Sequence, residues 1–557
     1  MNKMNLPVGI SNFKKIREDG YYYIDKTNLI QKLLVPKPAE VTLFTRPRRF
    51  GKTLGMNMLA HFFDIREDSR ELFQGLKISE NRELCEIWMN QYPVVLLSFK
   101  NVDGLEFETA YGKLESVIAE LYKSHYYLKD SEKLNEFDKD IFCRIAAKKA
   151  DTEEVMNSLF KLTHMLNLYY GKPVILLLDE YDVPAAKANV NGYYEQMLDM
   201  IRGILGAALK DNTFLKFAIV TGCLWITKES IFTGLNNFTM DTIQDSRYDE
   251  FFGFTQAEVD KLLEDASLIL HAEEIKEWYD GYRFGDMEVY CPWDVVNHVD
   301  NLLQNPEIKP IGYWKNSSDN AIIRSFIDYS GMAITQKFET LLSGGYIIEN
   351  IQEDITYNYL HSSEENLWSI LYFTGYLTRV SDGEVDKELA RGYYALKLPN
   401  KEIKEIFETT IKKWFTESAQ QMDRKVLFAS IWNGDDKKAT AEISRLLRRT
   451  ISYYDYREDF YHAFFAGIFA GAGYVVQSNK AHGEGRSDII VQDYAGDRLA
   501  VFGVKYSRKL EDLEADCEKA IAQIDEKMYA EEFQDTYAQV ICYGIAFYKK
   551  RCKILKK

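Results

Sequence analysis

The feature that most constrains this chain is a short apolar run that is followed by a turn and then by a helical pattern. Val41–Thr45 forms the run, Pro47 interrupts it, and Gly51-Lys52-Thr53 opens the helical spacing. In a loop of this kind the backbone N–H groups and the helix N-terminus bind an anion, a lysine reaches the β- and γ-phosphates, and a Ser/Thr hydroxyl ligates Mg²⁺. Lys52 and Thr53 suit these two roles. The standard motif has glycine where position 46 is arginine, so the stretch alone is a weak indication.

A second apolar stretch ends in acidic residues. The run from Pro173 to Leu178 carries no charge and is followed by Asp179 and Glu180. Strands buried on both faces of a parallel sheet have this composition. We expect Asp179 to hold Mg²⁺ and Glu180 to polarise the attacking water, because phosphoryl transfer depends mainly on positioning and charge compensation. The alternative is a core strand whose acids only cap a turn, but the two stretches in this order favour a nucleotide site.

Strands and helices alternate along the first half of the chain. Further buried strands are expected at 93–99 and 214–222, and helical spacing recurs at 53–63, 107–127, 153–170 and 193–210. This alternation predicts an α/β fold with a doubly wound parallel sheet, whose ligands bind at the carboxyl ends of the strands. Thr221, near the end of such a strand, is expected to sense the γ-phosphate or to orient the water. A strand that simply ends in a hydroxyl residue is an equally open alternative.

The sequence from Arg46 to Thr53 resembles the variant loop of bacterial and archaeal AAA-ATPase-like proteins that carry a C-terminal PD-(D/E)XK nuclease-like domain. Other similar stretches are spread over nearly the whole chain, at 6–13, 22–27, 228–237, 278–283 and 396–400. The resemblance implies a P-loop ATPase that uses ATP and Mg²⁺ and is fused to a nuclease fold. It also implies a nucleotide-binding set formed by Arg46, Arg48, Arg49, Gly51, Lys52 and Thr53.

One position near the predicted site departs from that family. Trp225 stands where the family usually has arginine. If that arginine compensates transition-state charge, its loss lowers the rate of hydrolysis by orders of magnitude and affects binding less. Arg48 and Arg49 either substitute for it in part or contact phosphates or a partner. Residues 1–40 either lie beside the nucleotide or cover the sheet.

From about residue 451 the predicted elements are a helix, three strands, a helix and a strand. Their order matches the core of PD-(D/E)XK nucleases, which need an Asp and a Glu on adjacent strands to bind a divalent metal, and a Lys two residues after the Glu. Asp488 and Lys505 fit the Asp and the Lys. Glu458 fits the helix acid that often joins the metal ligands.

The middle acid of this set is missing, because Gly503 stands where the family has glutamate. Alternate residues of a strand share a face, so a glutamate there would point to the same side as Lys505. With only Asp488 and Glu458 as ligands, we predict an inactive or strongly weakened nuclease fold. Cleavage with a rearranged metal site, a nucleic-acid-binding remnant and a structural domain remain alternatives. The basic tail at 549–557 is expected to be solvated.

A chain of 557 residues is too long for a single core. We expect an AAA-ATPase-like P-loop domain over 1–235, a helical lid over 236–300, a mainly helical connecting region over 301–450 and the nuclease-like domain over 451–557. In the lid, Thr255 is expected to cap a helix. Arg283 is a weaker candidate to reach the nucleotide, since a turn arginine paired with an acid is the favoured interpretation.

Overall composition limits the partners. The net charge of −16 argues against a protein that coats nucleic acid through bulk electrostatics, although a local basic channel stays open. The seven cysteines have no C-x-x-C spacing, so neither a zinc site nor a disulfide framework is indicated. The N-terminus lacks the apolar core of a signal peptide, and no run approaches the ~18 apolar residues of a spanning helix. We therefore expect a cytoplasmic protein with no membrane partner.

The sequence as a whole favours an ATP-binding protein, a slow Mg²⁺-dependent ATPase whose nucleotide state controls the C-terminal domain. One alternative is an ATP-gated, metal-dependent DNA or RNA nuclease. The other is a non-catalytic, nucleotide-sensing interaction protein, which Trp225 and Gly503 motivate. Nucleic acid at the C-terminal domain, a protein partner and a second copy of the chain are the candidate partners besides ATP.

Overall fold

The computed structural model describes residues 4–225, 238–314, 337–338, 340–353, 364–385, 389–410, 425–450, 461, 464–466, 468–469, 472–478, 481–482, 485–486, 489–526, 533–534, 536–549 and 551–557. The chain divides into two compact units. The first comprises Met1–Ser318 with Ile348–Lys404, and the second comprises Asp319–Ile347 with Glu405–Lys557. The connecting region expected over 301–450 is therefore shared between the two units.

The first unit is built on a five-stranded parallel sheet in the order β2-β3-β4-β1-β5. Its strands are β1 (Val41–Thr45), β2 (Val94–Ser98), β3 (Val174–Asp179), β4 (Leu215–Gly222) and β5 (Phe238–Asp241). All side chains of β1 and β3 are buried, as expected for strands covered on both faces. The sheet confirms the predicted α/β fold. Because β5 pairs with β1, the sheet continues beyond residue 235, where the domain was expected to end.

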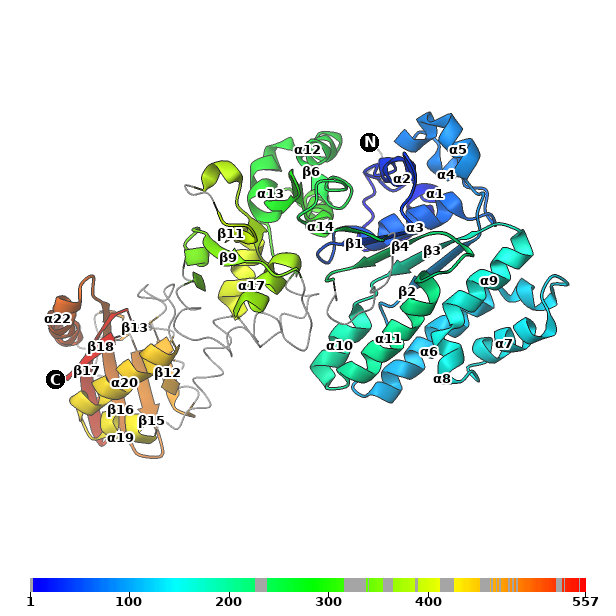
Figure 1. Cartoon of the computed structure of the whole chain (residues 1–557). Coiled ribbons are helices and arrows are strands. Elements are labelled where there is room, and N and C mark those ends of the chain that lie inside the picture. Colours follow the sequence, from blue (N-terminus) through cyan, green and yellow to red (C-terminus); the bar gives the residue numbers. More distant parts are fainter. Residues whose placement is uncertain are drawn as a thin grey trace. The chain divides into compact units, whose positions relative to one another are not determined.

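Helices cover both faces of this sheet (Figure 1). On one face lie α1 (Phe13–Glu18) and α3 (Lys52–Phe63), and the ring centroids of Phe63 and Phe217 are 5.6 Å apart. The core of the other face is formed with α6 (Phe107–Ser124), α7 (Glu136–Ala146), α9 (Ser158–Tyr170), α10 (Val183–Asn191) and α11 (Tyr194–Leu209). The remaining short elements of this part are α2 (Asn28–Leu34), α4 (Arg70–Phe73), η1 (Lys77–Glu80), α5 (Arg82–Trp88), η2 (Tyr126–Asp130) and α8 (Thr152–Met156).

The region after β5 contains the predicted lid helices together with a small sheet. Its helices are α12 (Gln256–Asp265), η3 (Ile269–His271), α13 (Ala272–Tyr279) and α14 (Pro292–Gln304). Thr255 and Glu258 form a capping box at the start of α12, which confirms the predicted cap. The sheet has the order β6-β8-β7, with β6 (Phe254–Thr255), β7 (Tyr282–Phe284) and β8 (Met287–Tyr290), and the sequence analysis did not anticipate it.

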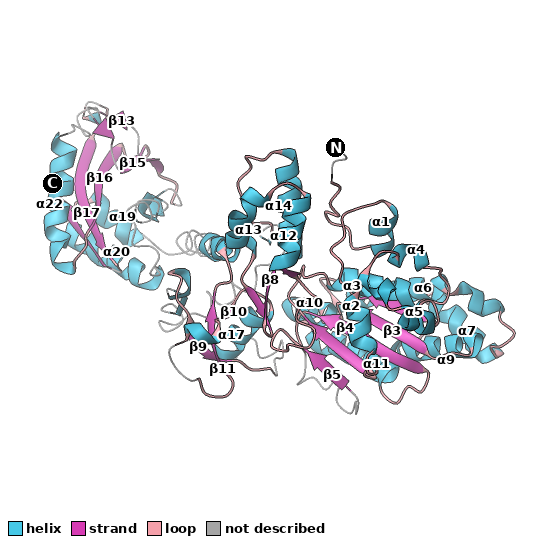
Figure 2. Cartoon of the chain, turned by 90° about the horizontal axis from the view of Figure 1, so that it is seen from above, coloured by secondary structure: helices cyan, strands magenta, loops and turns pink. Residues whose placement is uncertain are grey.

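The described part of the connecting region also contains strands. β9 (Ile347–Asn350), β10 (Thr378–Arg379) and β11 (Tyr393–Lys397) form a three-stranded sheet beside α17 (Glu364–Phe373), with η6 at Asp382–Glu384 (Figure 2). The helical middle region that the sequence predicts thus also contains a small sheet. These strands are short, and their polar and apolar residues do not alternate clearly enough to separate them from loops.

The second unit contains a five-stranded mixed sheet in the order β12-β15-β16-β17-β18. The strands are β12 (Val475–Ser478), β15 (Ile489–Asp493), β16 (Arg498–Tyr506), β17 (Gln539–Tyr548) and β18 (Arg551–Lys556), and only the β16–β17 pair is parallel. A separate hairpin pairs β13 (Ala481–His482) with β14 (Gly485–Arg486). η8 (Leu510–Asp512) leads into α22 (Leu513–Glu526), which packs on β16 and β17. α19 (Lys425–Trp432) and α20 (Asp436–Thr450) contribute to the other core of this sheet.

Candidate functional site

The strand order of the first unit brings the predicted site residues together. β4 lies between β1, which precedes the glycine-containing loop, and β3, which ends at Asp179. Phe44 is level with Thr221, and Leu178 is level with Val220. All three strands run in the same direction, so their carboxyl ends meet at one edge of the sheet.

Asp179 is the centre of this edge. It is 1% exposed and accepts hydrogen bonds from both predicted hydroxyl residues. Thr53 Oγ1 lies 2.8 Å from one carboxylate oxygen, and Thr221 Oγ1 lies 2.5 Å from the other. Mg²⁺ is held by few protein oxygens, because it keeps several waters and binds substrate phosphates. A carboxylate in contact with the first hydroxyl of α3 fits such a site.

Lys52 is turned inward, onto its own loop. Its ammonium group donates to the carbonyl oxygens of Arg46 at 2.9 Å and Pro47 at 2.8 Å, and lies 3.7 Å from the sulfur of Cys223. Gly51, just before α3, has φ +82°, a left-handed conformation that glycine adopts readily. The loop thus surrounds a buried cation at the N-terminus of a helix, which is the arrangement that binds phosphate.

Glu180 follows Asp179 in a left-handed conformation, with φ +55°. Such a conformation is strained for a residue with a Cβ and occurs often at functional sites. Burial raises the pKa of the Glu180 carboxyl, the neighbouring Asp179 raises it further, and Lys52 opposes the shift. Glu180 therefore lies directly after Asp179 at the end of β3. Its carboxylate is more basic than that of an exposed glutamate.

Arg46 occupies the position where the standard motif has glycine, and its side chain is fully buried. The guanidinium forms an ion pair with Asp241 at 2.5 Å and donates to the carbonyl oxygens of Thr45 and Asp241. It also lies over the rings of Phe252 and Phe284. These partners engage the side chain within the protein, so we interpret Arg46 as structural, in contrast to the expected contact with nucleotide.

The other loop residues separate into two groups. Arg49 donates to the carbonyl oxygen of Tyr313 at 2.9 Å, and its guanidinium carbon lies 4.7 Å from the centre of the Trp293 ring. Phe50 is buried against Tyr282 and other aromatic rings of the lid. Arg48, by contrast, is exposed. Of the three loop arginines, Arg48 is therefore the one whose position fits a phosphate or partner contact.

Arg49 also faces two fully buried acids, Asp294 and Glu402. Glu402 accepts the backbone N–H of Trp314 at 2.6 Å. Burial raises the pKa of Asp294 to about 6, against the hydrogen bond with Glu402, which lowers it. Burial and the neighbouring Asp294 raise the pKa of Glu402 to about 10. The pair therefore retains a proton at neutral pH. Sequence analysis missed both residues, because nothing in the local pattern brings positions 294 and 402 together.

Trp225 replaces the arginine expected from the family. Its side chain is partly buried against the core on the α6–α11 face of the sheet, and its indole N–H has no hydrogen-bond partner among the described residues. The residue therefore supplies apolar contact where the family has a cation. The segment 228–237, which also resembled the family, lies outside the described residues.

Arg283, the weaker lid candidate, lies in β7 and is tied to neighbouring backbone. Its N–H donates to the hydroxyl of Thr378 at 2.9 Å, and its side chain is 3.4 Å from the carbonyl oxygen of Gly285. These contacts favour the structural interpretation over contact with nucleotide.

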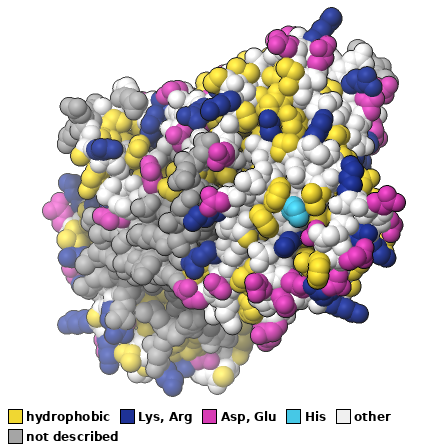
Figure 3. Space-filling model, turned by 45° about the vertical axis from the view of Figure 1, so that its right-hand side comes forward, with side chains coloured by type: hydrophobic (Ala, Val, Ile, Leu, Met, Phe, Trp, Pro, Cys, Tyr) yellow, Lys and Arg dark blue, Asp and Glu magenta, His cyan; other side chains and the backbone are white. Residues whose placement is uncertain are grey.

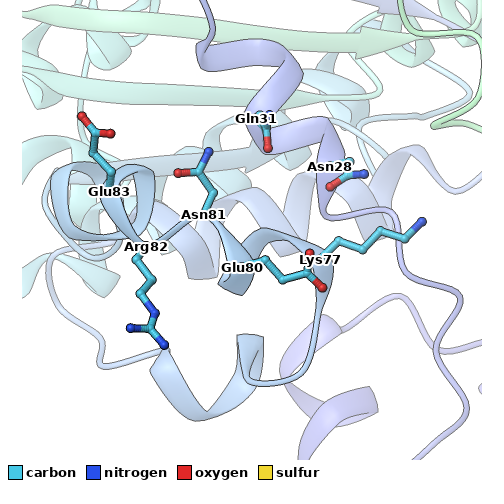
Figure 4. Close-up of a pocket in the computed structure, with 7 residues that line it drawn as sticks. All are labelled: Asn28, Gln31, Lys77, Glu80, Asn81, Arg82 and Glu83. Atoms are coloured by element: carbon cyan, nitrogen blue, oxygen red, sulfur yellow. The ribbon is translucent and has the colours of Figure 1, made fainter.

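A hollow of about 750 Å³ lies between α2, η1 and the start of α5 (Figure 4). The hollow is lined by two basic side chains, two acidic side chains and three amides: Lys77, Arg82, Glu80, Glu83, Asn28, Gln31 and Asn81. None of these residues belongs to the predicted site. The mixed charge and the exposed lining give the hollow no clear ligand chemistry.

The N-terminal segment connects several parts of the first unit. Lys26 forms an ion pair with Glu258 at 2.6 Å, and Tyr22 donates to Asp265 at 2.9 Å. The backbone N–H of Phe13 donates to Asn57 of α3 at 2.6 Å. For residues 1–40 these bonds favour a structural role, in which the segment covers the sheet, over a position beside the nucleotide.

The predicted nuclease residues are only partly within the described chain, since Glu458 and Asp488 lie outside it. Lys505 is half-buried near the end of β16, and Gly503 lies on the same side of that strand. A Cβ at Gly503 would lie 2.7 Å from the carbonyl oxygen of Ala520 in α22. At Gly544, the register partner of Gly503, a Cβ would lie 2.2 Å from the carbonyl oxygen of Cys517. The helix backbone therefore occupies the space that an acidic side chain at 503 would need.

The C-terminal tail forms a strand that the sequence did not predict, while its basic side chains Arg551, Lys556 and Lys557 are exposed. β18 pairs with β17, and Cys552 and Ile554 contribute to the core. Elsewhere on the surface, basic and acidic side chains are interspersed on the face shown in Figure 3. The described residues contain no cluster of three or more His, Cys, Asp or Glu side chains suited to a metal ion. No helix within the described ranges is both long and apolar enough to span a membrane.

A parallel sheet with these groups at the carboxyl ends of β1, β3 and β4 is consistent with the P-loop NTPase class. Comparison with known proteins agrees: residues 7–232 match the family model for a predicted AAA-ATPase, and residues 456–557 match that of the PD-(D/E)XK nuclease superfamily. The chain thus combines an AAA-ATPase-like domain with a C-terminal domain of the PD-(D/E)XK nuclease superfamily.

A relative from Azotobacter chroococcum mcd 1 is similar along its whole length. It is 27% identical over 558 residues, which cover 98% of this chain and 97% of the relative. Its name is "Uncharacterized protein in vnfD 5'region". The similarity extends over both matched regions of this chain and assigns no activity to it.

Proposed function

We propose that this protein binds ATP at the loop 46–53, hydrolyses it slowly with Mg²⁺, and uses its nucleotide state to control the C-terminal domain. The observation that carries the proposal is the meeting of three strand ends at Asp179, which accepts the hydroxyl groups of both Thr53 and Thr221. The AAA-ATPase family match over residues 7–232 supports it.

Each residue has a role in this proposal. Lys52 exchanges the carbonyl oxygens of its own loop for phosphate oxygens, which are stronger partners for an ammonium group. Thr53 and Asp179 hold Mg²⁺, which supplies charge compensation at the phosphates. Glu180 orients the attacking water and accepts its proton, a role that its raised pKa favours. Thr221, at the end of β4, donates a hydrogen bond to Asp179 and so holds its carboxylate in position.

The loop also offers a route for control. Phe50 contacts Tyr282 of the lid, and Arg49 contacts Tyr313 of the connecting region and faces Glu402. The chain passes into the second unit at Glu405, three residues after Glu402. A change in the loop on nucleotide binding therefore acts on the segment that leads to the C-terminal domain.

Phosphate release from ATP with Mg²⁺ tests the proposal, with ATP binding measured in parallel. Lys52→Ala is expected to lose both binding and turnover. Glu180→Gln is expected to keep binding and to lower turnover by about 10²–10⁴-fold, the usual contribution of a general base. Lys210→Ala, which removes an exposed lysine at the end of α11, is the control and is expected to behave as wild type. A wild-type chain that binds ATP without turnover would contradict the ATPase part and favour a nucleotide-sensing protein.

A second candidate function is metal-dependent cleavage of DNA or RNA. It is favoured by the superfamily match over 456–557 and by Lys505 near the end of β16. It is opposed by Gly503, where α22 leaves no room for the acid. It predicts Mg²⁺- or Mn²⁺-dependent cleavage that is lost in Asp488→Ala and Lys505→Ala. Unaltered substrate after incubation with wild type would eliminate it.

A further inference from the structure

Asp182 lies in the turn between β3 and α10, in a position where an aspartate often caps the helix. Its carboxylate makes no capping bond to α10. One of its oxygens instead accepts the backbone N–H groups of Cys223 at 2.9 Å and Leu224 at 3.0 Å. The side chain is 3% exposed and joins the end of β3 to the residues that follow β4.

Tyr181 strengthens the same connection. Its hydroxyl donates to the carbonyl oxygen of Leu224 at 2.9 Å, and its backbone N–H donates to the carbonyl oxygen of Thr221 at 3.1 Å. Gly222 lies beneath the two side chains: a Cβ there would lie 2.7 Å from the Tyr181 ring and 2.8 Å from Asp182. Position 222 therefore has to be glycine for this close approach.

The segment held in this way contains two contacts of the nucleotide site. At one end Thr221 donates to Asp179. At the other end the Cys223 sulfur lies 3.7 Å from the Lys52 ammonium. The backbone N–H of Arg46 also donates to the carbonyl oxygen of Gly222 at 3.1 Å, which joins the segment to the loop. A shift of residues 222–224 would therefore move the partners of both Asp179 and Lys52.

The second oxygen of Asp182 is buried and has no hydrogen-bond partner among the described residues. The cations that face the carboxylate are Lys52 and Arg48, and the acid Glu180 lies nearby. An unpaired carboxylate oxygen in the interior is costly unless a polar group meets it in some state of the protein. Its position beside the expected phosphate-binding cations indicates a functional reason to keep it.

From this geometry we infer that Asp182 is a positioning residue of the ATPase site: it fixes the segment Thr221–Leu224 so that Thr221 and Lys52 stay aligned with Asp179. The inference rests on the proposed ATPase function. Asp182 acts through backbone groups and touches none of the reacting atoms. Its loss should therefore lower kcat and leave KM for ATP nearly unchanged, since Lys52 and the helix N-terminus remain.

The test combines turnover with a measurement that needs no turnover. Asp182→Ala is expected to lower kcat by about 10²-fold, the cost of a displacement of about 1 Å in a catalytic group, with KM changed less than about threefold. The rate of iodoacetamide alkylation at Cys223, followed by mass spectrometry, should rise severalfold in this variant because the N–H groups of 223 and 224 are released. Alkylation of Cys291, which is buried in the lid, serves as the internal reference.

Two further variants separate positioning from simple loss of stability. Asp182→Asn keeps an oxygen that can accept both N–H groups, so its kcat should recover most of the loss. The Asp182 charge contributes, after burial, to the raised pKa of the Cys223 thiol, so both variants alkylate faster than wild type, and Asp182→Asn should stay well below Asp182→Ala. Asp138→Ala removes a different buried aspartate, in α7, and should lower the melting temperature with kcat and Cys223 alkylation unchanged.

Wild-type kcat together with wild-type alkylation in Asp182→Ala would overturn the inference. So would a loss of kcat in Asp182→Asn as large as in Asp182→Ala, because it would show that the negative charge matters and the hydrogen bonds do not. A wild-type chain without turnover would contradict the proposed function. In that case equal alkylation rates in Asp182→Ala and Asp182→Asn overturn the positioning role, and a faster rate in Asp182→Ala than in Asp182→Asn supports it.

Discussion

The two predicted sites of this chain depart from their family patterns in different ways. At the N-terminal site, Arg46 replaces a glycine, but it forms a buried ion pair with Asp241 and leaves Lys52, Thr53 and Asp179 in contact or in reach. At the C-terminal site, Gly503 replaces an acid, and the backbone of α22 takes the space. The first change adds a structural anchor and keeps the chemical groups. The second removes a ligand and also the room for it.

The largest effect is expected at the anchor. Arg46→Ala leaves Asp241 buried without its partner and should lower the free energy of unfolding of the first unit by about 3–5 kcal/mol. Chemical denaturation followed by tryptophan fluorescence measures it. The double variant Arg46→Met with Asp241→Asn removes both charges and should recover much of the loss. An Arg46→Ala variant as stable as wild type would show that the anchor contributes little and would weaken the contrast between the two sites.

At the C-terminal site, restoring the acid should destabilise the domain and give no nuclease. Gly503→Glu forces a side chain against the α22 backbone at Ala520 and should cost about 3 kcal/mol, at the upper end for overpacked cores. Gly503→Ala, the steric control, should cost less. Thermal unfolding and Mn²⁺-dependent cleavage are the measurements. A stable Gly503→Glu variant that cleaves DNA would contradict this prediction. It would show that α22 can move to make room for the acid, and that the C-terminal site lacks only one side chain.

Thr221→Val tests how closely the N-terminal groups depend on one another. The change keeps the shape of the side chain and removes the hydrogen bond to Asp179. We expect kcat for ATP to fall about tenfold, the equivalent of about 1.4 kcal/mol, with little change in KM. Thr163→Val, which removes a buried hydroxyl in α9, is the control and should leave kcat unchanged. If Thr163→Val lowered kcat more than Thr221→Val does, the loss of kcat would reflect reduced stability of the fold and not the bond to Asp179.

The last prediction concerns the buried acids beside Arg49, and its size depends on pH. In the folded protein the pKa values of Asp294 and Glu402 are raised to about 6 and about 10, above those of the unfolded chain. The unfolded state therefore loses protons first, and the pair destabilises the fold increasingly as the pH rises from about 4. Glu402→Gln mimics the protonated form, so it should come close to wild type at pH 5, and its advantage in melting temperature should grow steadily from pH 5 to pH 9. A pH-independent difference would contradict the shared proton.

The sequence was sufficient for the parts of the fold that repeat a simple pattern. The strands β1, β2, β3 and β4 were predicted within one or two residues, because runs buried on both faces are distinctive. The convergence of the loop, Asp179 and Thr221 followed from the rule that ligands bind at the carboxyl ends of parallel strands. The structure brings Thr53, Thr221 and Asp179 into contact as that rule predicts.

The remaining features depend on contacts between distant positions. The pair Asp294 and Glu402, the anchor Arg46–Asp241 and the closeness of Gly503 to Ala520 each join residues that no local pattern relates. The strands of the lid and of the connecting region are two to five residues long, too short for periodicity to identify. The tail at β18 was missed because its positive charges concealed the alternation that places Cys552 and Ile554 in the core.

The paired glycines beneath α22 have an evolutionary consequence. Gly503 and Gly544 are level with each other on adjacent strands, and the helix rests on both. A mutation that restores glutamate at 503 meets the helix before it can benefit from any metal, so selection would remove it for its effect on folding. Several coordinated changes in α22 and β17 would have to come first. The packing therefore ties the two positions together: a side chain at either glycine requires a compensating change in α22.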